Sequence, residues 1–168
     1  GFGEAVEALT GFTGLRRRFE IVGEASGVTV VDDFAHNPDK IAATVRTARS
    51  GYFERLLLFF QPHGYGPLRT MKHELIGTFA CEMASNDVLI MPDPVYFGGT
   101  TSREVGSRDI VEGVTGLGRR AEHVADRQAC ADRLVALARP RDCILVMGAR
   151  DDSLTQFAEE IVARLAAK

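Results

Sequence analysis

Three short, continuous apolar runs constrain the fold of this 168-residue chain more than any other feature of its sequence. They are RLLLFF at 55–60, DVLIMP at 87–92 and CILVMG at 143–148. A strand that is apolar at consecutive positions is buried on both faces, as happens in a parallel sheet covered by helices. The runs therefore predict the central strands of a parallel sheet.

The segments around these runs complete the pattern. A helix is predicted over 38–50, with Asn37 as its N-cap and Pro38 at its first position. Further predicted elements are helices over 68–83, 107–116, 127–138 and 152–165, a short strand over 121–124, and a hairpin of 19–22 and 28–31 joined by GEASG. Strands that alternate with helices imply an α/β fold with a mostly parallel sheet, helices on both faces and a short N-terminal β-hairpin.

Composition excludes several classes of protein. The 20 basic and 23 acidic residues leave a net charge of −3, which argues against a binder of nucleic acid or of anionic membranes. No apolar run approaches the roughly 20 residues that cross a bilayer. Cys81, Cys130 and Cys143 have no metal-ligand spacing and are predicted to be reduced, mostly buried thiols of a cytosolic protein.

The sharpest local signal is VVDDFAHNPDK at 30–40, where a strand runs into a helix. One interpretation is structural: Asn37 caps the helix, one aspartate accepts loop amides and His36 is an ordinary loop residue. The functional interpretation is that Asp32 or Asp33 accepts hydrogen bonds from ribose hydroxyls or holds a metal, with His36 beside a nucleotide. Both remain open on local grounds.

Other polar stretches also lie beside predicted strands. Arg16, Arg17 and Arg18 are either a solvated cluster or include one guanidinium that grips phosphate. The loop QPHGYGPLRT at 61–70 and the turn GARDD at 148–152 each follow a buried strand, and ligands of open α/β sheets bind at that edge.

Several nucleotide and catalytic motifs are missing from the sequence. It contains no Walker-type phosphate loop, no G-x-G-x-x-G at the first strand–helix turn, no nucleophile elbow and no metal-spaced His/Cys cluster. The pattern therefore predicts a nucleotide-like pocket without its own phosphate loop, and no metal site.

Taken in order, GLRRRFE, a hairpin, VTVVDDFAHNPDKIAATVRTAR and LLLFFQPHGY resemble the C-terminal domain of Mur ligases. These are ATP-dependent enzymes that build the peptide of the bacterial cell-wall precursor. The nearest branch is that of UDP-N-acetylmuramate–L-alanine ligase and the muropeptide ligase. The resemblance implies a Rossmann-like domain over 15–168, with 1–14 as a hinge and the tail of a central ATPase domain.

The same resemblance implies roles for particular residues. Arg18 is the implied catalytic residue, reaching the phosphates of ATP, while Asp33 contacts the ribose and His36 and Asn37 line the adenosine side. ATP and Mg²⁺ are bound mainly by the central domain. The implied contacts to the second substrate come from Gln61, His63, Tyr65, Arg69 and Arg150.

The implied reaction activates a carboxylate as an acyl phosphate, which an amine attacks to give an amide, ADP and phosphate. The implied partners are UDP-N-acetylmuramate, an amino acid or muramyl peptide, and the protein's own N-terminal and central domains, in the cytoplasm. The chain alone is not expected to turn over. Alternatives are a folylpolyglutamate synthase-like ligase domain and a non-catalytic, receiver-like binding domain.

Two departures from the family pattern concern the second substrate. Gly64 and Pro67 stand where the alanine-adding branch carries arginines that hold the amino-acid carboxylate, and Arg150 stands in place of a glycine. Our hypothesis is that Arg69 or Arg150 replaces this carboxylate clamp.

Overall fold

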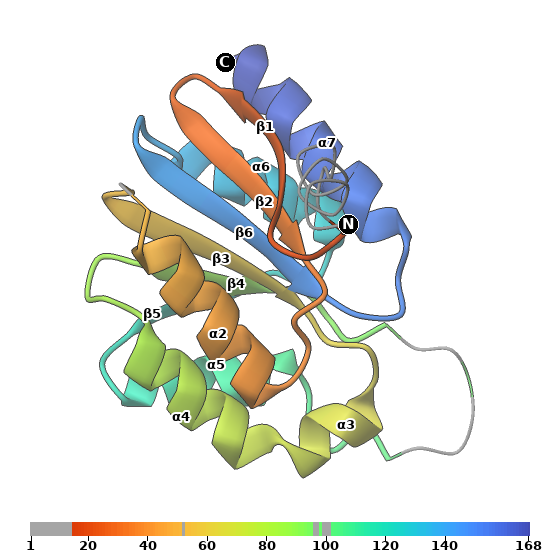
Figure 1. Cartoon of the computed structure of the whole chain (residues 1–168). Helices are drawn as coiled ribbons and strands as arrows, with labels where there is room; N and C mark the ends of the chain where they lie inside the picture. Colours follow the sequence, from red (N-terminus) through yellow and green to blue (C-terminus); the bar gives the residue numbers. More distant parts are fainter. Residues whose placement is uncertain (1–14, 52, 96–97, 99–101) are drawn as a thin grey trace, which may run out of the picture.

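The computed structural model describes residues 15–51, 53–95, 98 and 102–168. The predicted hinge over residues 1–14 lies outside this part of the chain. A six-stranded sheet in the order β1-β2-β6-β3-β4-β5 forms the centre of the domain (Figure 1). Its strands are β1 (Glu20–Ala25), β2 (Val28–Asp33), β3 (Arg55–Gln61), β4 (Val88–Met91), β5 (Arg120–His123) and β6 (Asp142–Gly148). Only β1 runs antiparallel to its neighbour, which confirms the predicted mostly parallel sheet with a hairpin at its edge.

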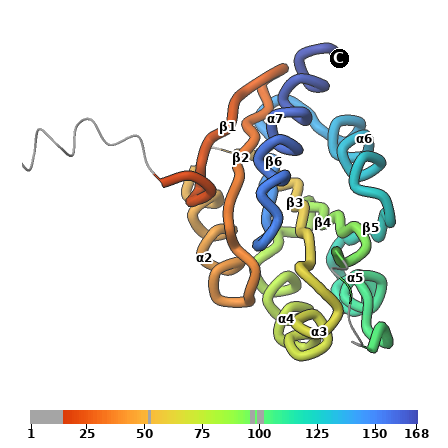
Figure 2. The backbone as a smooth tube through the Cα atoms, turned by 90° about the vertical axis from the view of Figure 1, so that its right-hand side faces the viewer, coloured from red at the N-terminus to blue at the C-terminus, as the bar shows by residue number. Residues whose placement is uncertain are grey.

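Helices cover both faces of this sheet, as predicted. They are α2 (Pro38–Arg49), α3 (Tyr65–Thr70), α4 (Lys72–Glu82), α5 (Ser107–Gly116), α6 (Arg127–Leu137) and α7 (Ser153–Ala166). The buried residues of α2, α4 and α5 pack in one core, and those of α6 and α7 pack in a second core. Figure 2 shows α2 and α6 on opposite sides of the strands.

Strand β3 shows why the apolar runs were continuous. Leu56, Leu58 and Phe60 belong to the core beneath α2, α4 and α5, whereas Leu57 and Phe59 belong to the core beneath α6 and α7. Successive side chains of a strand point to opposite faces, so both faces of β3 must be apolar.

The hairpin turn is shorter than predicted. Strands β1 and β2 extend to Ala25 and Val28, leaving only Ser26 and Gly27 between them. Both have left-handed backbones, with φ of 52° and 72°. This combination matches the twist of a two-residue hairpin loop, for which glycine at the second position is well suited.

The helix predicted over 68–83 is instead two helices, α3 and α4, that meet at Met71. Met71 has φ −98° and ψ 9°, outside the helical region. The first helix begins earlier than predicted, at Tyr65, because Pro67 then lies in its first turn, where a missing backbone N–H costs little. The apolar spacing of Leu68, Leu75 and Phe79 continues through the break, so periodicity did not reveal it.

Candidate functional site

The carboxyl ends of β2, β6 and β3 lie side by side at one edge of the sheet. Asp33 is paired with Met147 and Gln61 with Gly148 in the strand register. The chain leaves β6 towards α7 on one face, whereas it leaves both neighbouring strands towards helices on the other face. Such a reversal opens a crevice between loops, and ligands of α/β sheets bind there.

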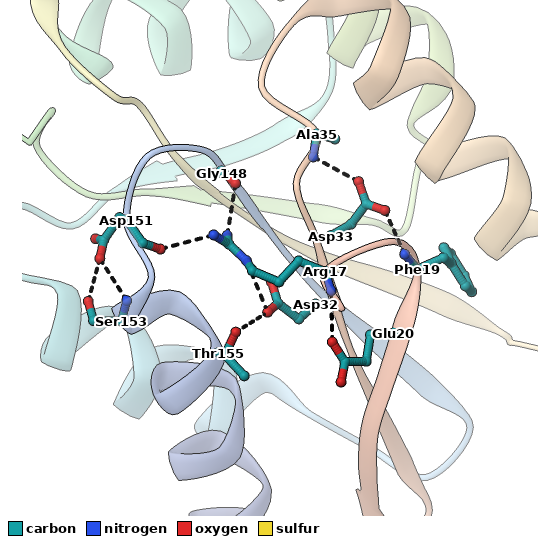
Figure 3. A network of polar contacts seen from close by, with 10 residues as sticks. All are labelled: Arg17, Phe19, Glu20, Asp32, Asp33, Ala35, Gly148, Asp151, Ser153 and Thr155. Atoms are coloured by element: carbon teal, nitrogen blue, oxygen red, sulfur yellow. Dashed lines mark hydrogen bonds and ion pairs between the residues drawn. The ribbon is translucent and has the colours of Figure 1, made fainter. Parts of the chain in front are cut away.

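The two adjacent aspartates of β2 point to opposite faces of the sheet (Figure 3). Asp32 accepts a hydrogen bond of 2.7 Å from the Thr155 hydroxyl in α7, and Asp33 accepts one of 2.9 Å from the Thr44 hydroxyl in α2. This follows from the alternation of side chains along a strand. The two aspartates therefore lie in separate environments, one beneath α7 and the other beneath α2.

Asp33 organises the segment that precedes β1. Besides the Thr44 hydroxyl, its carboxylate accepts the backbone N–H of Phe19 at 2.7 Å and that of Ala35 at 2.8 Å. A carboxylate offers about four acceptor positions, and these three hydrogen bonds occupy three of them. The structural interpretation and the ribose-binding interpretation of this aspartate are compatible.

Asp32 is fully buried and pairs with Arg17 rather than with a ligand group. The Arg17 Nε atom lies 3.2 Å from an Asp32 carboxylate oxygen. Burial raises the pKa of Asp32, and the Thr155 hydrogen bond and the charge of Arg17 oppose that rise. Asp32 is thus a structural acceptor within a closed network.

The three consecutive arginines differ sharply in their surroundings. Arg17 is 8% exposed, whereas Arg16 and Arg18 are exposed. The Arg18 guanidinium lies 5.2 Å from the Phe34 ring centroid and makes no hydrogen bond or ion pair with any described residue. Arg18 therefore stacks on Phe34, and its N–H donors have no partner among the described residues.

Beside this segment lies an open cavity of about 690 Å³. It is bounded by 15–18, Phe34 and the first turns of α7, including Thr155 and Gln156. Arg18 therefore borders a space large enough for part of a ligand.

His36 and His63 meet across the ends of β2 and β3. Their ring centroids are 5.4 Å apart in an edge-to-face arrangement, and His36 Nδ1 lies 3.0 Å from the Phe34 carbonyl oxygen. Burial lowers the pKa of His63, and the nearby charges of His36 and Arg150 lower it further. His63 is thus favoured as a neutral imidazole beside the Arg150 turn.

Arg150 lies in the turn after β6 and has a left-handed backbone, with φ 59°. Its side chain is exposed and forms no hydrogen bond or ion pair within the described ranges. The resemblance to Mur ligases implies a glycine at this place, and a left-handed φ is what glycine adopts at no cost. Arg150 therefore holds an unfavourable backbone conformation with its charge towards solvent.

The remaining candidates have different surroundings. Gln61 is 2% exposed, and its amide donates to the Asp93 carbonyl at 3.0 Å, which joins two loops. Tyr65 starts α3 with the Arg103 guanidinium 5.7 Å from its ring, and Arg69 is exposed in the last turn of α3. The side-chain oxygen of Asn37 caps α2 by accepting the Lys40 N–H at 3.0 Å, as predicted.

Sequence reasoning missed the partners that hold the candidate residues. Arg17 was only one of three equivalent arginines in the sequence, and Thr44 and Thr155 gave no signal because each lies within an ordinary helical pattern. At the start of α7, the Asp151 carboxylate accepts the Ser153 backbone N–H at 3.0 Å. No group of three or more metal-ligating side chains occurs among the described residues.

Residues 17–150 match the family model described as Mur ligase, glutamate ligase domain. The chain is 34% identical over 166 residues to UDP-N-acetylmuramate–L-alanine ligase from Geobacter sulfurreducens, covering 98% of this chain and 35% of that protein. It therefore spans about a third of such curated relatives.

Solved structures agree with this match. The UDP-N-acetylmuramate–alanine ligase of Thermotoga maritima has a TM-score of 0.68 and 26% identity, covering 96% of this chain and 32% of its own. FolC from E. coli in complex with ADP has a TM-score of 0.56 at 18% identity, covering 91% of this chain and 32% of its own, which shows a shared fold alone. The matches favour the ligase interpretation over a receiver-like domain.

Proposed function

Because the chain belongs to the Mur ligase family as its glutamate ligase domain, we propose that it is part of an ATP-dependent ligase of peptidoglycan precursor synthesis. The whole enzyme joins an amino acid or a muramyl peptide to UDP-N-acetylmuramate, with release of ADP and phosphate. The observation that carries this proposal is the identity of 34% across 98% of the chain to a UDP-N-acetylmuramate–L-alanine ligase.

In this proposal the domain closes over ATP that is held mainly by a central domain. Arg18 contacts the phosphates, and its exposed guanidinium without a hydrogen-bond partner among the described residues suits that role. Asp33 accepts a ribose hydroxyl through the fourth acceptor position of its carboxylate, since its three internal hydrogen bonds use the other three. His36 and Asn37 line the adenosine side of the nucleotide.

The chemistry requires negative charge to be balanced where the phosphoryl group is transferred. A positioned arginine stabilises that charge in the transition state without reorganising during the reaction. Mg²⁺, held mainly by the central domain, supplies further charge compensation on the phosphates. The contribution of this chain is thus to bring Arg18 to a site completed by another domain.

The second substrate is proposed to bind near His63, Tyr65 and Arg150. Arg150 suits a carboxylate better than Arg69 does, because its turn follows β6, the strand between β2 and β3, and His36 and His63 lie 5.4 Å apart at the ends of those two strands. Gln61 contributes by joining the loops after β3 and β4, since its side chain is buried. The ligand class is therefore an amine that carries a free carboxylate.

The proposed setting is the cytoplasm, where ATP and nucleotide-linked precursors are available. The three cysteines are all free, and burial raises the pKa of Cys130 and Cys143 to about 12, which keeps them as unreactive thiols. None of the helices that the structure describes is long and apolar enough to cross a membrane. The proposed partners of the domain are the N-terminal and central domains of the same enzyme.

The test is ADP release by the complete protein with ATP, Mg²⁺ and UDP-N-acetylmuramate. L-alanine, other amino acids and a muramyl tripeptide are supplied in turn as the amine. Turnover that depends on one of these amines supports the proposal, and the 168-residue chain alone should show none. Turnover only with a folate and glutamate, or with no acceptor at all, would contradict it.

A further inference from the structure

We propose that Arg17 and Asp32 are a positioning pair that holds Arg18 and the Arg150 turn in one fixed arrangement. This inference rests on the proposed function, because it assigns Arg18 to the phosphates and Arg150 to the second substrate. In this proposal neither member of the pair contacts a substrate. Both act through the backbone that carries the two exposed arginines.

The contacts of Arg17 reach in three directions (Figure 3). Its Nε atom meets Asp32, its Nη1 atom donates to the Asp151 carbonyl at 3.0 Å, and its Nη2 atom donates to the Gly148 carbonyl at 2.9 Å. The two carbonyls flank Arg150 in the chain. One buried guanidinium therefore fixes both ends of the turn that presents Arg150.

The same residue fixes the segment that presents Arg18. The Arg17 backbone N–H donates to the Glu20 carboxylate at 2.7 Å, and its carbonyl accepts the Phe34 N–H at 2.9 Å. On the other side of Arg18, the Phe19 N–H donates to Asp33 at 2.7 Å. The peptide units on both sides of Arg18 are thus tied to the end of β2.

Backbone strain supports the assignment. Arg17 and Phe19 both have left-handed backbones, with φ of 53° and 50°, and neither is a glycine. Such conformations persist only where surrounding contacts over-determine them, and they cluster at functional sites. Here they flank a single residue, Arg18, whose side chain is left exposed beside the cavity.

The chemistry of arginine explains why this residue stands at position 17. A planar guanidinium can donate to a carboxylate and to two carbonyl oxygens in fixed directions at once, whereas a lysine ammonium on a flexible stem cannot reproduce that fork. The Asp32 carboxylate neutralises the buried charge and is itself held by Thr155. Arg17→Lys therefore keeps the charge but loosens the arrangement.

A matched control lies at the opposite edge of the sheet. Arg55 is 7% exposed, its Nη2 atom lies 2.6 Å from an Asp142 carboxylate oxygen, and the same nitrogen donates to the Leu137 carbonyl at 2.7 Å. It has the same kind of contacts as Arg17 but lies at the amino end of β3. Arg55→Lys therefore measures the effect on folding of loosening a buried arginine that lies away from the Arg18 segment.

The first experiment is a double-mutant cycle in the complete ligase, with kcat and the KM for ATP measured for Arg17→Lys, Arg18→Ala and the double variant. We expect Arg17→Lys alone to lower kcat by about tenfold or more. In the double variant, kcat should be less than about twofold below that of Arg18→Ala alone. Arg55→Lys should leave kcat within about twofold of wild type. Losses of Arg17→Lys and Arg18→Ala that multiply, or an unchanged kcat in Arg17→Lys, would overturn the inference. A wild-type enzyme without any ligase turnover would instead refute the proposed function.

The second experiment needs no turnover and uses the 168-residue chain. Hydrogen exchange is followed at the Phe19 and Phe34 amides in wild type, Arg17→Lys and Asp32→Asn, with the amides of β3 as the measure of intact folding. Exchange at Phe19 and Phe34 should become about tenfold faster in both variants while β3 stays protected. Equal protection of the two amides in all three proteins would show that the pair does not hold this segment.

Discussion

Replacing Arg150 with glycine is expected to stabilise the fold. A left-handed backbone costs a non-glycine residue about 1–2 kcal/mol, and Arg150 has φ 59° with no hydrogen bond to described residues that would be lost. Glycine adds about 0.5–1 kcal/mol of conformational entropy to the unfolded chain. The net gain is therefore about 0.5–1 kcal/mol, or roughly 2–3 °C in Tm for a domain of this size.

The same substitution should weaken binding of the second substrate. A hydrogen bond between a guanidinium and a carboxylate contributes about 1.5–3 kcal/mol, so its loss should raise the KM for the amine substrate by roughly 10- to 100-fold. The KM for ATP should stay near the wild-type value. One change thus raises stability and lowers activity, as expected where a strained residue serves function.

Arg141→Gly is the matched control for this substitution. Arg141 also has a left-handed backbone, with φ 73°, and its side chain forms an ion pair with Glu54, in which both side chains are more than half exposed. Such a surface pair adds little stability. Arg141→Gly should therefore stabilise the fold by a similar amount without changing either KM. Thermal unfolding of the 168-residue chain measures the change in stability, and steady-state kinetics of the complete ligase measure the two KM values. A lower Tm in Arg150→Gly, or an unchanged KM for the amine substrate, would refute the reasoning.

Two further predictions concern the ribose contact and the helix packing. Asp33→Ala removes the acceptor of two backbone amides and the Thr44 hydroxyl, so it should destabilise the fold by about 2–4 kcal/mol and raise the KM for ATP about tenfold in the complete ligase. Thr44→Val should lower stability by only about 1 kcal/mol, and an ATP KM that is the same in Asp33→Ala as in Thr44→Val would remove the ribose assignment. Gly77→Ala should stabilise α4 by about 1 kcal/mol, because an added Cβ meets nothing within 4 Å. Gly113→Ala should instead destabilise, by about 1 kcal/mol, because its Cβ would lie 2.8 Å from Ile76 Cγ1; denaturant unfolding that ranked the two variants in the opposite order would contradict this packing.

The fold could be predicted from the sequence because its central strands leave a pattern that survives without tertiary information. Both faces of β3 and β6 are buried, so the residues at 56–60 and 143–148 are all apolar or small, and the Asn37-Pro38 start of α2 is encoded by local capping chemistry. The break at Met71 was missed because the apolar spacing on either side of it is continuous. A boundary of that kind is set by local backbone geometry rather than by hydrophobic pattern.

The site was only partly predictable, for a different reason. The sequence shows that Asp32, Asp33 and three arginines are unusual, but not which of them pair. Arg17 is buried and Arg18 is exposed because Arg17 contacts Gly148 and Asp151, which lie more than 130 positions later in the chain. Contacts of that range leave no local signal, so the ribose and phosphate assignments remain predictions that only kinetics can test.

The central claim is that this domain brings Arg18 to the phosphates of ATP during ligation. It is tested most directly by comparing Arg18→Ala with Arg16→Ala in the complete ligase, since both remove one exposed charge from neighbouring positions. Arg18→Ala should lower kcat by about 10²- to 10³-fold with little change in the KM for ATP, whereas Arg16→Ala should stay within about twofold of wild type. An Arg18→Ala enzyme with the kcat of wild type would contradict the account.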